Sequence, residues 1–142
     1  MSTAVQTAAD VMTASPRTCS PFSTVLEAVM IFRDADCGAV PIVDAGKPVG
    51  VVTDRDVALA LAEMPDLVGH SVSEIMSKDP ITVSPETPVS EIEAKIASNA
   101  VRRLLVVDQS GTLVGIVAWA DLARHDSATR IGQTVSEVLE TA

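Results

Sequence analysis

The stretch Gly50-Val51-Val52-Thr53-Asp54-Arg55-Asp56 passes from an apolar strand into a cluster of short polar side chains, and residues 57–62 continue with helical composition. Thr53 and Asp54 are both suitable helix N-caps, because either side chain can accept a hydrogen bond from the free amides of the first turn. Asp56 lies within that turn, where the helix dipole favours a carboxylate. Taken alone, the stretch predicts a strand that turns directly into a capped helix.

Much of the first half of the chain recurs 64 residues later. The identical pairs include Met12 and Met76, Thr18 and Thr82, Pro21 and Pro85, Val25 and Val89, Glu27 and Glu91, and Asp44 and Asp108. After a loop that is one residue longer, Gly115 and Asp121 follow Gly50 and Asp56 by 65 positions. This pattern indicates a tandem duplication. Because copies of about 60 residues are marginally stable alone, we expect the two to share one core.

Each copy is predicted to have the order strand, helix, strand, strand, helix. Apolar periodicity predicts helices over residues 24–33 and 88–97, and residues 39–43 and 48–52 form strands joined by a hairpin turn. We expect a flexible N-terminus (1–9), a first repeat (10–63), a linker (64–74), a second repeat (75–126) and a C-terminal segment (127–142). Residues 132–139 resemble 69–76, so we expect this last segment to be a short helix that covers exposed core.

Composition argues against several classes of partner. The chain has 142 residues with ten basic and nineteen acidic side chains, a formal net charge of −9, two Phe, one Trp and no Tyr. Nucleic acid and anionic membranes attract basic surfaces, and single-strand platforms need aromatic rings, so we expect neither partner. No stretch resembles a signal peptide or a membrane span, and we expect a cytoplasmic protein.

The sequence offers little chemistry for an enzyme. It contains no evident pairing of a nucleophile with a base and no glycine-rich phosphate loop. Cys19, Cys37, His70 and His125 do not have the spacing of metal ligands. We therefore predict no catalytic residues, no metal and no obligatory cofactor.

In this order and twice over, the segments resemble a tandem pair of CBS domains, the regulatory module named after cystathionine β-synthase. The resemblance spans residues 8–126 and rests on the paired segments 10–12 and 74–76, 39–44 and 103–108, and 50–56 and 115–121. It implies an α/β fold of two pseudo-symmetric repeats with two clefts, usually assembled as a disc-like homodimer. Such pairs bind AMP, ADP, ATP or S-adenosylmethionine, perform no chemistry, and signal to a protein partner that this sequence does not identify.

The resemblance also implies that each cleft combines the strand-to-helix turn of one repeat with the walls of the other. The predicted ligand contacts of the first cleft are Val51, Thr53, Arg55, Asp56, Asp79, Pro80, Arg102 and Arg103. Here Asp56 is expected to bind ribose hydroxyls, Thr53 a ribose or phosphate oxygen, and the arginine pair phosphates.

The second cleft is expected to be weaker. Its predicted contacts are Pro16, Arg17, Gly38, Ala39, Ile116 and Asp121. Ala118 replaces the hydroxyl residue of the family pattern, and Gly38-Ala39 takes the place of the arginine pair. We therefore expect this cleft to be weak, empty or suited to an uncharged adenosyl group.

Other interpretations of these residues remain open. Thr53 and Asp56 are also a sufficient helix cap, and Asp121 is also an ordinary first-turn carboxylate. Arg55 and the arginine pair are also compatible with solvent-facing charges, and Trp119 with a core or dimer contact. The sequence thus favours a regulatory module that senses cellular adenylates, with a ligand-independent dimerisation or interaction scaffold as the alternative.

Overall fold

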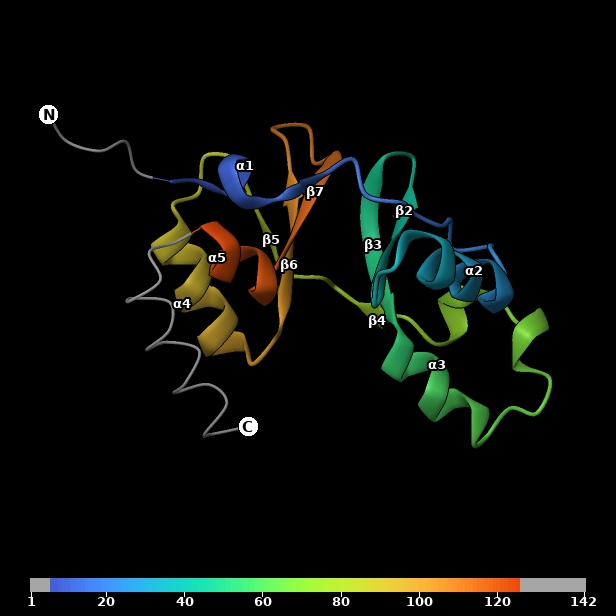
Figure 1. Ribbon diagram of the computed structural model, residues 1–142. Coiled ribbons are helices and arrows are strands. Elements are labelled where there is room, and N and C mark those ends of the chain that lie inside the picture. Colours follow the sequence, from blue (N-terminus) through green and yellow to red (C-terminus); the bar gives the residue numbers. More distant parts are fainter. Residues whose placement is uncertain (1–5, 126–142) are drawn as a thin grey trace, which may run out of the picture.

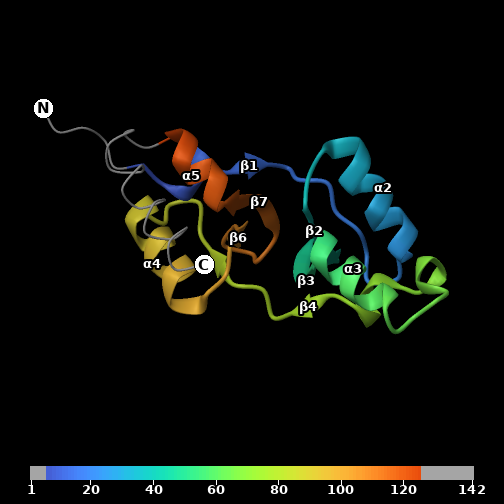
Figure 2. The ribbon, with the colours of Figure 1, turned by 60° about the horizontal axis from the view of Figure 1, so that its bottom comes forward.

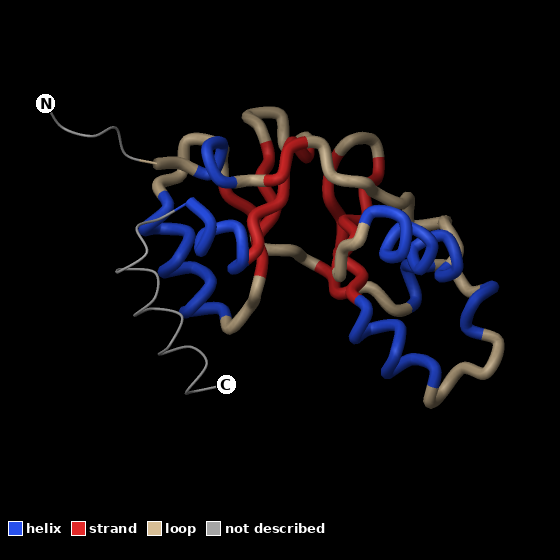
Figure 3. The backbone as a smooth tube through the Cα atoms, viewed as in Figure 1, coloured by secondary structure: helices blue, strands red, loops and turns tan. Residues whose placement is uncertain are grey.

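The computed structural model describes residues 6–125 and has two β-sheets near the middle of the molecule with helices on the outer sides (Figure 1, Figure 3). The first half contains α2 (Val25–Ala35), β2 (Ala39–Asp44), β3 (Lys47–Thr53) and α3 (Asp54–Leu61). The second contains β5 (Thr82–Val83), α4 (Val89–Asn99), β6 (Arg103–Val107), β7 (Leu113–Ala118) and α5 (Trp119–His125). The preceding segments hold α1 (Ala8–Val11) and β1 (Thr13–Ala14), and two 3₁₀ turns (Leu67–Gly69, Val72–Glu74) and β4 (Ser77–Lys78).

The duplicated order and the α/β class are confirmed. In the first repeat, β2 and β3 form the predicted antiparallel hairpin, with Asp44 opposite Lys47. Ala45 and Gly46 have φ of +53° and +83°, the left-handed geometry that a two-residue hairpin turn requires. The expected first strand is reduced here to one bridge between Cys19 and Ile42, whereas β5 in the second repeat pairs with β6.

The leading segments, residues 8–14 and 72–78, are exchanged between the repeats. Strand β1 pairs with β7 of the second sheet, and β4 pairs with β3 of the first. Ala8 and Val11 are accordingly buried in the second core, and Val72 in the first. Figure 2 shows the two connections, one blue and one green, that run between the halves.

Two core clusters are present among the described residues, so the expected single shared core is wrong. The exchange of leading segments joins the halves instead. It also changes the roles of two segments expected to be peripheral. Helix α1 begins at Ala8, within the expected flexible N-terminus, and Leu67, within the expected linker, is buried in the first core. The expected C-terminal helix at 127–142 lies outside the described residues.

Glycines permit the close approach of the exchanged segments. A Cβ on Gly50 would lie 2.6 Å from the sulfur of Met76 and 2.8 Å from the carbonyl oxygen of Ser77. At the equivalent crossing, a Cβ on Gly115 would meet the side chain of Met12 and lie 3.2 Å from the carbonyl oxygen of Thr13. The duplicated Met and Gly residues therefore contact each other across the two repeats.

Candidate functional site

The strand-to-helix turn of the first repeat is a capping box. Thr53 is the N-cap of α3, so that of the two candidates Thr53, and not Asp54, has this role. Its hydroxyl accepts from the Asp56 amide at 3.1 Å, and its own amide donates to Oδ2 of Asp56 at 2.9 Å. These two bonds satisfy two backbone amides at the start of the helix.

The second repeat keeps half of this arrangement. The Ala118 amide donates to Oδ2 of Asp121 at 2.7 Å, but Ala118 has no hydroxyl to return a bond to the helix. The Asp121 side chain belongs to a buried residue that is only 5% exposed, whereas Asp56 is half-buried. The two capping carboxylates therefore occupy different environments.

Beside the first turn lies cavity 1, with a volume of about 490 Å³. This volume is within the roughly 300–1,000 Å³ that is usual for small-molecule sites. Seven of the eight residues predicted for the first cleft line it: Val51, Thr53, Arg55, Asp79, Pro80, Arg102 and Arg103. Asp56 is not among the lining residues, because it lies beside Thr53 as its capping partner.

Cavity 2 lies beside the second turn and has the same volume of about 490 Å³. All six residues predicted for the second cleft line it: Pro16, Arg17, Gly38, Ala39, Ile116 and Asp121. Arg103 also lines this cavity, so the arginine that we assigned only to the first cleft is shared.

Several lining residues were missed at the sequence level. These are Ser77, Lys78, Ile81, Asn99, Ala100, Val101 and Leu105 at cavity 1, and Thr13, Ser15, Ala35, Asp36, Cys37, Arg103 and Ala120 at cavity 2. Six of these fourteen residues adjoin a residue predicted for the same cleft, which is the signal that could have found them.

The walls of the two cavities have matching backbone geometry. Asp79 and Ala100 at cavity 1 have φ of +54° and +53°, and their equivalents at cavity 2, Ser15 and Asp36, have +49° and +50°. Each left-handed residue ends a segment and turns the chain along the cavity. Pairs of non-glycine residues in this region are uncommon, so the duplication has retained a specific wall geometry.

The cavities differ in charge although their volumes are equal. Cavity 1 is lined by four basic residues and one acidic residue: Arg55, Lys78, Arg102, Arg103 and Asp79. Cavity 2 is lined by two basic and two acidic residues: Arg17, Arg103, Asp36 and Asp121. Cavity 1 is therefore the more favourable of the two for an anion.

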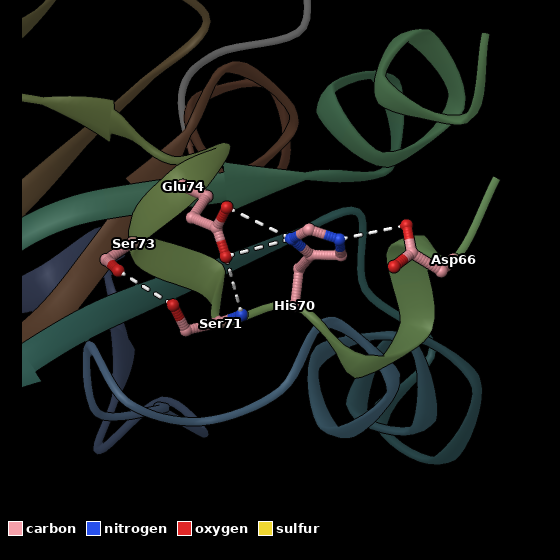
Figure 4. A network of polar contacts seen from close by, with 5 residues as sticks. All are labelled: Asp66, His70, Ser71, Ser73 and Glu74. Carbon is pink, nitrogen blue, oxygen red and sulfur yellow. Dashed lines mark hydrogen bonds and ion pairs between the residues drawn. The ribbon is translucent and has the colours of Figure 1, made fainter. Parts of the chain in front are cut away.

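Outside both cavities, His70 lies between two carboxylates in the segment that precedes β4 (Figure 4). Its Nδ1 is 3.0 Å from Glu74 and its Nε2 is 3.0 Å from Asp66. Hydrogen bonds to Glu74 and then to Asp66 raise the pKa of His70, and they lower the pKa of both carboxylates. The carbonyl oxygen of His70 also accepts from the Val25 amide at 2.8 Å, which ties this segment to the start of α2.

Among the described residues we also considered metal ligands, cysteines and membrane-spanning helices. Within residues 6–125, no three His, Cys, Asp or Glu side chains are grouped so that they could hold a metal ion. Cys19 is buried, and this burial raises the pKa of its thiol. None of the described helices is both long and apolar enough to cross a membrane.

Comparison with known proteins identifies the repeats. The family model described as "CBS domain" matches residues 8–63 and 72–128. The chain is 38% identical over 114 residues to the CBS domain-containing protein YhcV of Bacillus subtilis, which covers 80% of this chain and 81% of YhcV.

Two solved structures resemble the fold throughout. CBSX2 in complex with AMP has a TM-score of 0.74 and 28% identity, over 89% of this chain and 98% of that one. The CBS domain pair of MJ0100, in complex with 5′-methylthioadenosine and S-adenosyl-L-methionine, has a TM-score of 0.76 and 30% identity, over 85% of this chain and 95% of that one.

Proposed function

The chain belongs to the CBS domain family, and from that premise we propose that it is a non-catalytic regulatory module that binds an adenosine-containing ligand between its repeats. The observation that carries the proposal is the pair of equal cavities, each lined by both repeats. The adenosyl ligands of CBSX2 and of the MJ0100 pair support this ligand class.

Cavity 1 is the proposed site for AMP, ADP or ATP. The guanidinium groups of Arg102 and Arg103 provide forked donors that match phosphate oxygens, and Lys78 adds a further cation. The Thr53 hydroxyl is available to ribose or phosphate oxygens, and Val51 offers an apolar surface for the base. Asp56 holds the Thr53 backbone by the bond to its amide, and its contact with ribose hydroxyls stays a prediction.

Cavity 2 is the proposed site for an adenosyl group without phosphates. Asp36 and Asp121 repel phosphate, but a carboxylate accepts hydrogen bonds from ribose hydroxyls and attracts a positively charged sulfonium. S-adenosylmethionine or its uncharged relatives therefore match this lining better than a nucleotide does. The module is further proposed to act as a homodimer that senses cellular adenylates and passes their occupancy to a protein partner.

A ligand-independent scaffold is the second candidate, because one observation favours it. The capping box already accounts for Thr53 and Asp56 without any ligand. In that case the cavities would be unused and the fold would serve dimerisation or partner docking alone.

Calorimetric titration and thermal unfolding with AMP, ATP and S-adenosylmethionine separate the two candidates. A ligand that binds only the native state stabilises it by RT ln(1 + [L]/Kd), about 2.7 kcal/mol at a hundredfold excess over Kd. The midpoint of unfolding should rise with at least one of the three ligands. No binding heat and no rise with any of them, for a folded protein, would favour the scaffold.

A charge-matched pair of variants assigns the site. Arg102→Ala should weaken AMP binding about tenfold, since it removes a charged donor from cavity 1. Arg33→Ala is the control, because Arg33 has a 70% exposed side chain, pairs with Asp34 and lines neither cavity. Equal losses in the two variants would indicate only the change in net charge.

A further inference from the structure

Arg103 is the one residue common to the linings of both cavities in the part of the chain that the structure describes. It is half-buried, and it is the first residue of β6, directly opposite Ala118 at the end of β7. Strand β6 thus begins between the two cavities, and Arg103 contributes to the wall of each.

The first repeat has no counterpart to this side chain. The equivalent position is Ala39, which begins β2 opposite Thr53 and lines cavity 2 only. Because the methyl group of Ala39 carries no charge, the two cavities share one arginine and not two. The approximate symmetry of the repeats is therefore broken at this position.

One guanidinium cannot serve two phosphates equally. Its donors form a rigid planar fork that binds one phosphate or carboxylate in a bidentate manner. Without Arg103, cavity 1 still has three basic residues against one acidic residue. Cavity 2 would have only Arg17 against Asp36 and Asp121, a lining that repels an anion.

We propose that Arg103 couples the two cavities negatively for phosphate-bearing ligands: a phosphate in one cavity engages the shared guanidinium and weakens binding of a second phosphate in the other. This inference rests on the proposed function and adds a regulatory property to it. By linkage the antagonism is reciprocal, and couplings of this kind are typically fivefold or more in affinity. An adenosyl ligand without phosphate does not engage Arg103 in this way and is not coupled.

The test is a titration of ¹⁵N-labelled protein with AMP, followed by the amide signals of Thr53 and Ala118. These amides report separately on cavity 1 and cavity 2, and each donates to the capping carboxylate of its own repeat. In the wild type, the Ala118 signal should shift at a higher AMP concentration than the Thr53 signal. Adenosine, which lacks the phosphate, is the matched control ligand.

Three variants isolate the shared side chain. Arg103→Ala should raise the AMP midpoints of both signals about tenfold and leave those of adenosine nearly unchanged. The double change Lys78→Ala and Arg102→Ala, at residues that line cavity 1 only, should raise the Thr53 midpoint and lower the Ala118 midpoint about fivefold. In the Arg103→Ala background, the same double change should no longer affect the Ala118 midpoint.

Each outcome is decisive. The coupling is overturned if Arg103→Ala moves only one of the two midpoints, if the double change leaves the Ala118 midpoint where it was, or if the Ala118 signal never responds to AMP. The proposed function itself fails if neither signal responds to AMP, adenosine or S-adenosylmethionine in the wild type. The same spectra report whether each variant is folded, and Arg103→Gln, which keeps much of the side chain, gives a second measurement should Arg103→Ala unfold.

Discussion

The two capping carboxylates should contribute unequally to stability, with Asp121→Ala the more damaging substitution. In the first repeat, Asp56→Ala removes the acceptor of the Thr53 amide but leaves the Thr53 hydroxyl as a cap for the next turn. In the second repeat, Asp121→Ala removes the acceptor of the Ala118 amide. Ala118 has no hydroxyl, so no side-chain cap remains at the start of this helix. Asp121 is also buried, so its removal leaves a gap where the carboxylate packed, beside the half-buried Ala118 amide.

The expected magnitudes follow from these differences. Loss of one partner in a half-buried cap costs about 0.5–1 kcal/mol of unfolding free energy. Loss of the short hydrogen bond to the charged Asp121 acceptor costs about 1.5–3 kcal/mol, because the half-buried Ala118 donor stays unpaired. For a chain of this size, each kcal/mol corresponds to roughly 2–4 °C in the midpoint of thermal unfolding. Asp56→Ala should therefore lower that midpoint by about 2–4 °C and Asp121→Ala by about 5–10 °C.

Thermal and urea unfolding followed by circular dichroism, in the absence of nucleotide, are the appropriate assays. Asp56→Asn and Asp121→Asn serve as matched controls, since the amide oxygen remains an acceptor while the charge is lost. Each Asn variant should recover at least half of the loss of its Ala variant. An Asp56→Ala loss equal to or larger than that of Asp121→Ala would refute this account of the two turns.

Two further predictions concern the segment that precedes β4 and its crossing point. Glu74 and Asp66 raise the pKa of His70, so the protonated ring stabilises the fold fully below its unfolded pKa of about 6.5. This contribution is lost as the pH rises through the higher folded pKa. His70→Gln should therefore lower the midpoint of thermal unfolding more at pH 5.5 than at pH 8.5, and equal losses at the two pH values would contradict this. Gly50→Ala should cost about 1–3 kcal/mol of unfolding free energy because its Cβ would overlap Met76 and the Ser77 backbone, whereas Gly69→Ala, with no atom within 4 Å, should be nearly neutral in the same urea assay.

Much of the fold was predictable because the sequence is a tandem duplication, so each repeat supports the assignment of the other. Repeated Met, Pro, Gly and Asp residues at offsets of 64 and 65 locate equivalent segments and turns, and apolar periodicity locates the helices between them. The exchange of leading segments was not predictable in the same way. An offset shows that Met12 and Met76 are equivalent, but it does not show which sheet each one contacts. Helix α1 is four residues long and therefore too short to carry a periodic signal of its partner.

The residues of the candidate site were likewise only partly predictable from the sequence. Pro16 with Arg17, and Pro80 with Asp79, were assigned to the clefts because the family resemblance implies walls from these segments, whereas their neighbours Ser15 and Ile81 were missed. A carboxylate three residues after a threonine, however, fits both a cap and a ribose contact, and the spacing does not show whether it also lines a cavity. Asp56 lies outside the lining of cavity 1, whereas Asp121 lines cavity 2. Arg103 lines both cavities because it begins β6 opposite the end of β7, between the two cavities. The spacing of residues along the chain does not show this arrangement.

Each cavity adjoins one of the two connections between the repeats. Cavity 1 is lined by residues 77–81, which run from β4 in the first sheet to β5 in the second. Cavity 2 is lined by Thr13 and residues 15–17, which run from β1 in the second sheet towards the bridge of Cys19 with Ile42 in the first. A ligand in either cavity would therefore contact both repeats and the chain that joins them. A ligand shifts a conformational equilibrium only by its difference in affinity between the two conformations. Contacts confined to one repeat are the same in two arrangements of the repeats and would produce no signal. Contacts with a connection change when the repeats move, so they can give the ligand this difference in affinity.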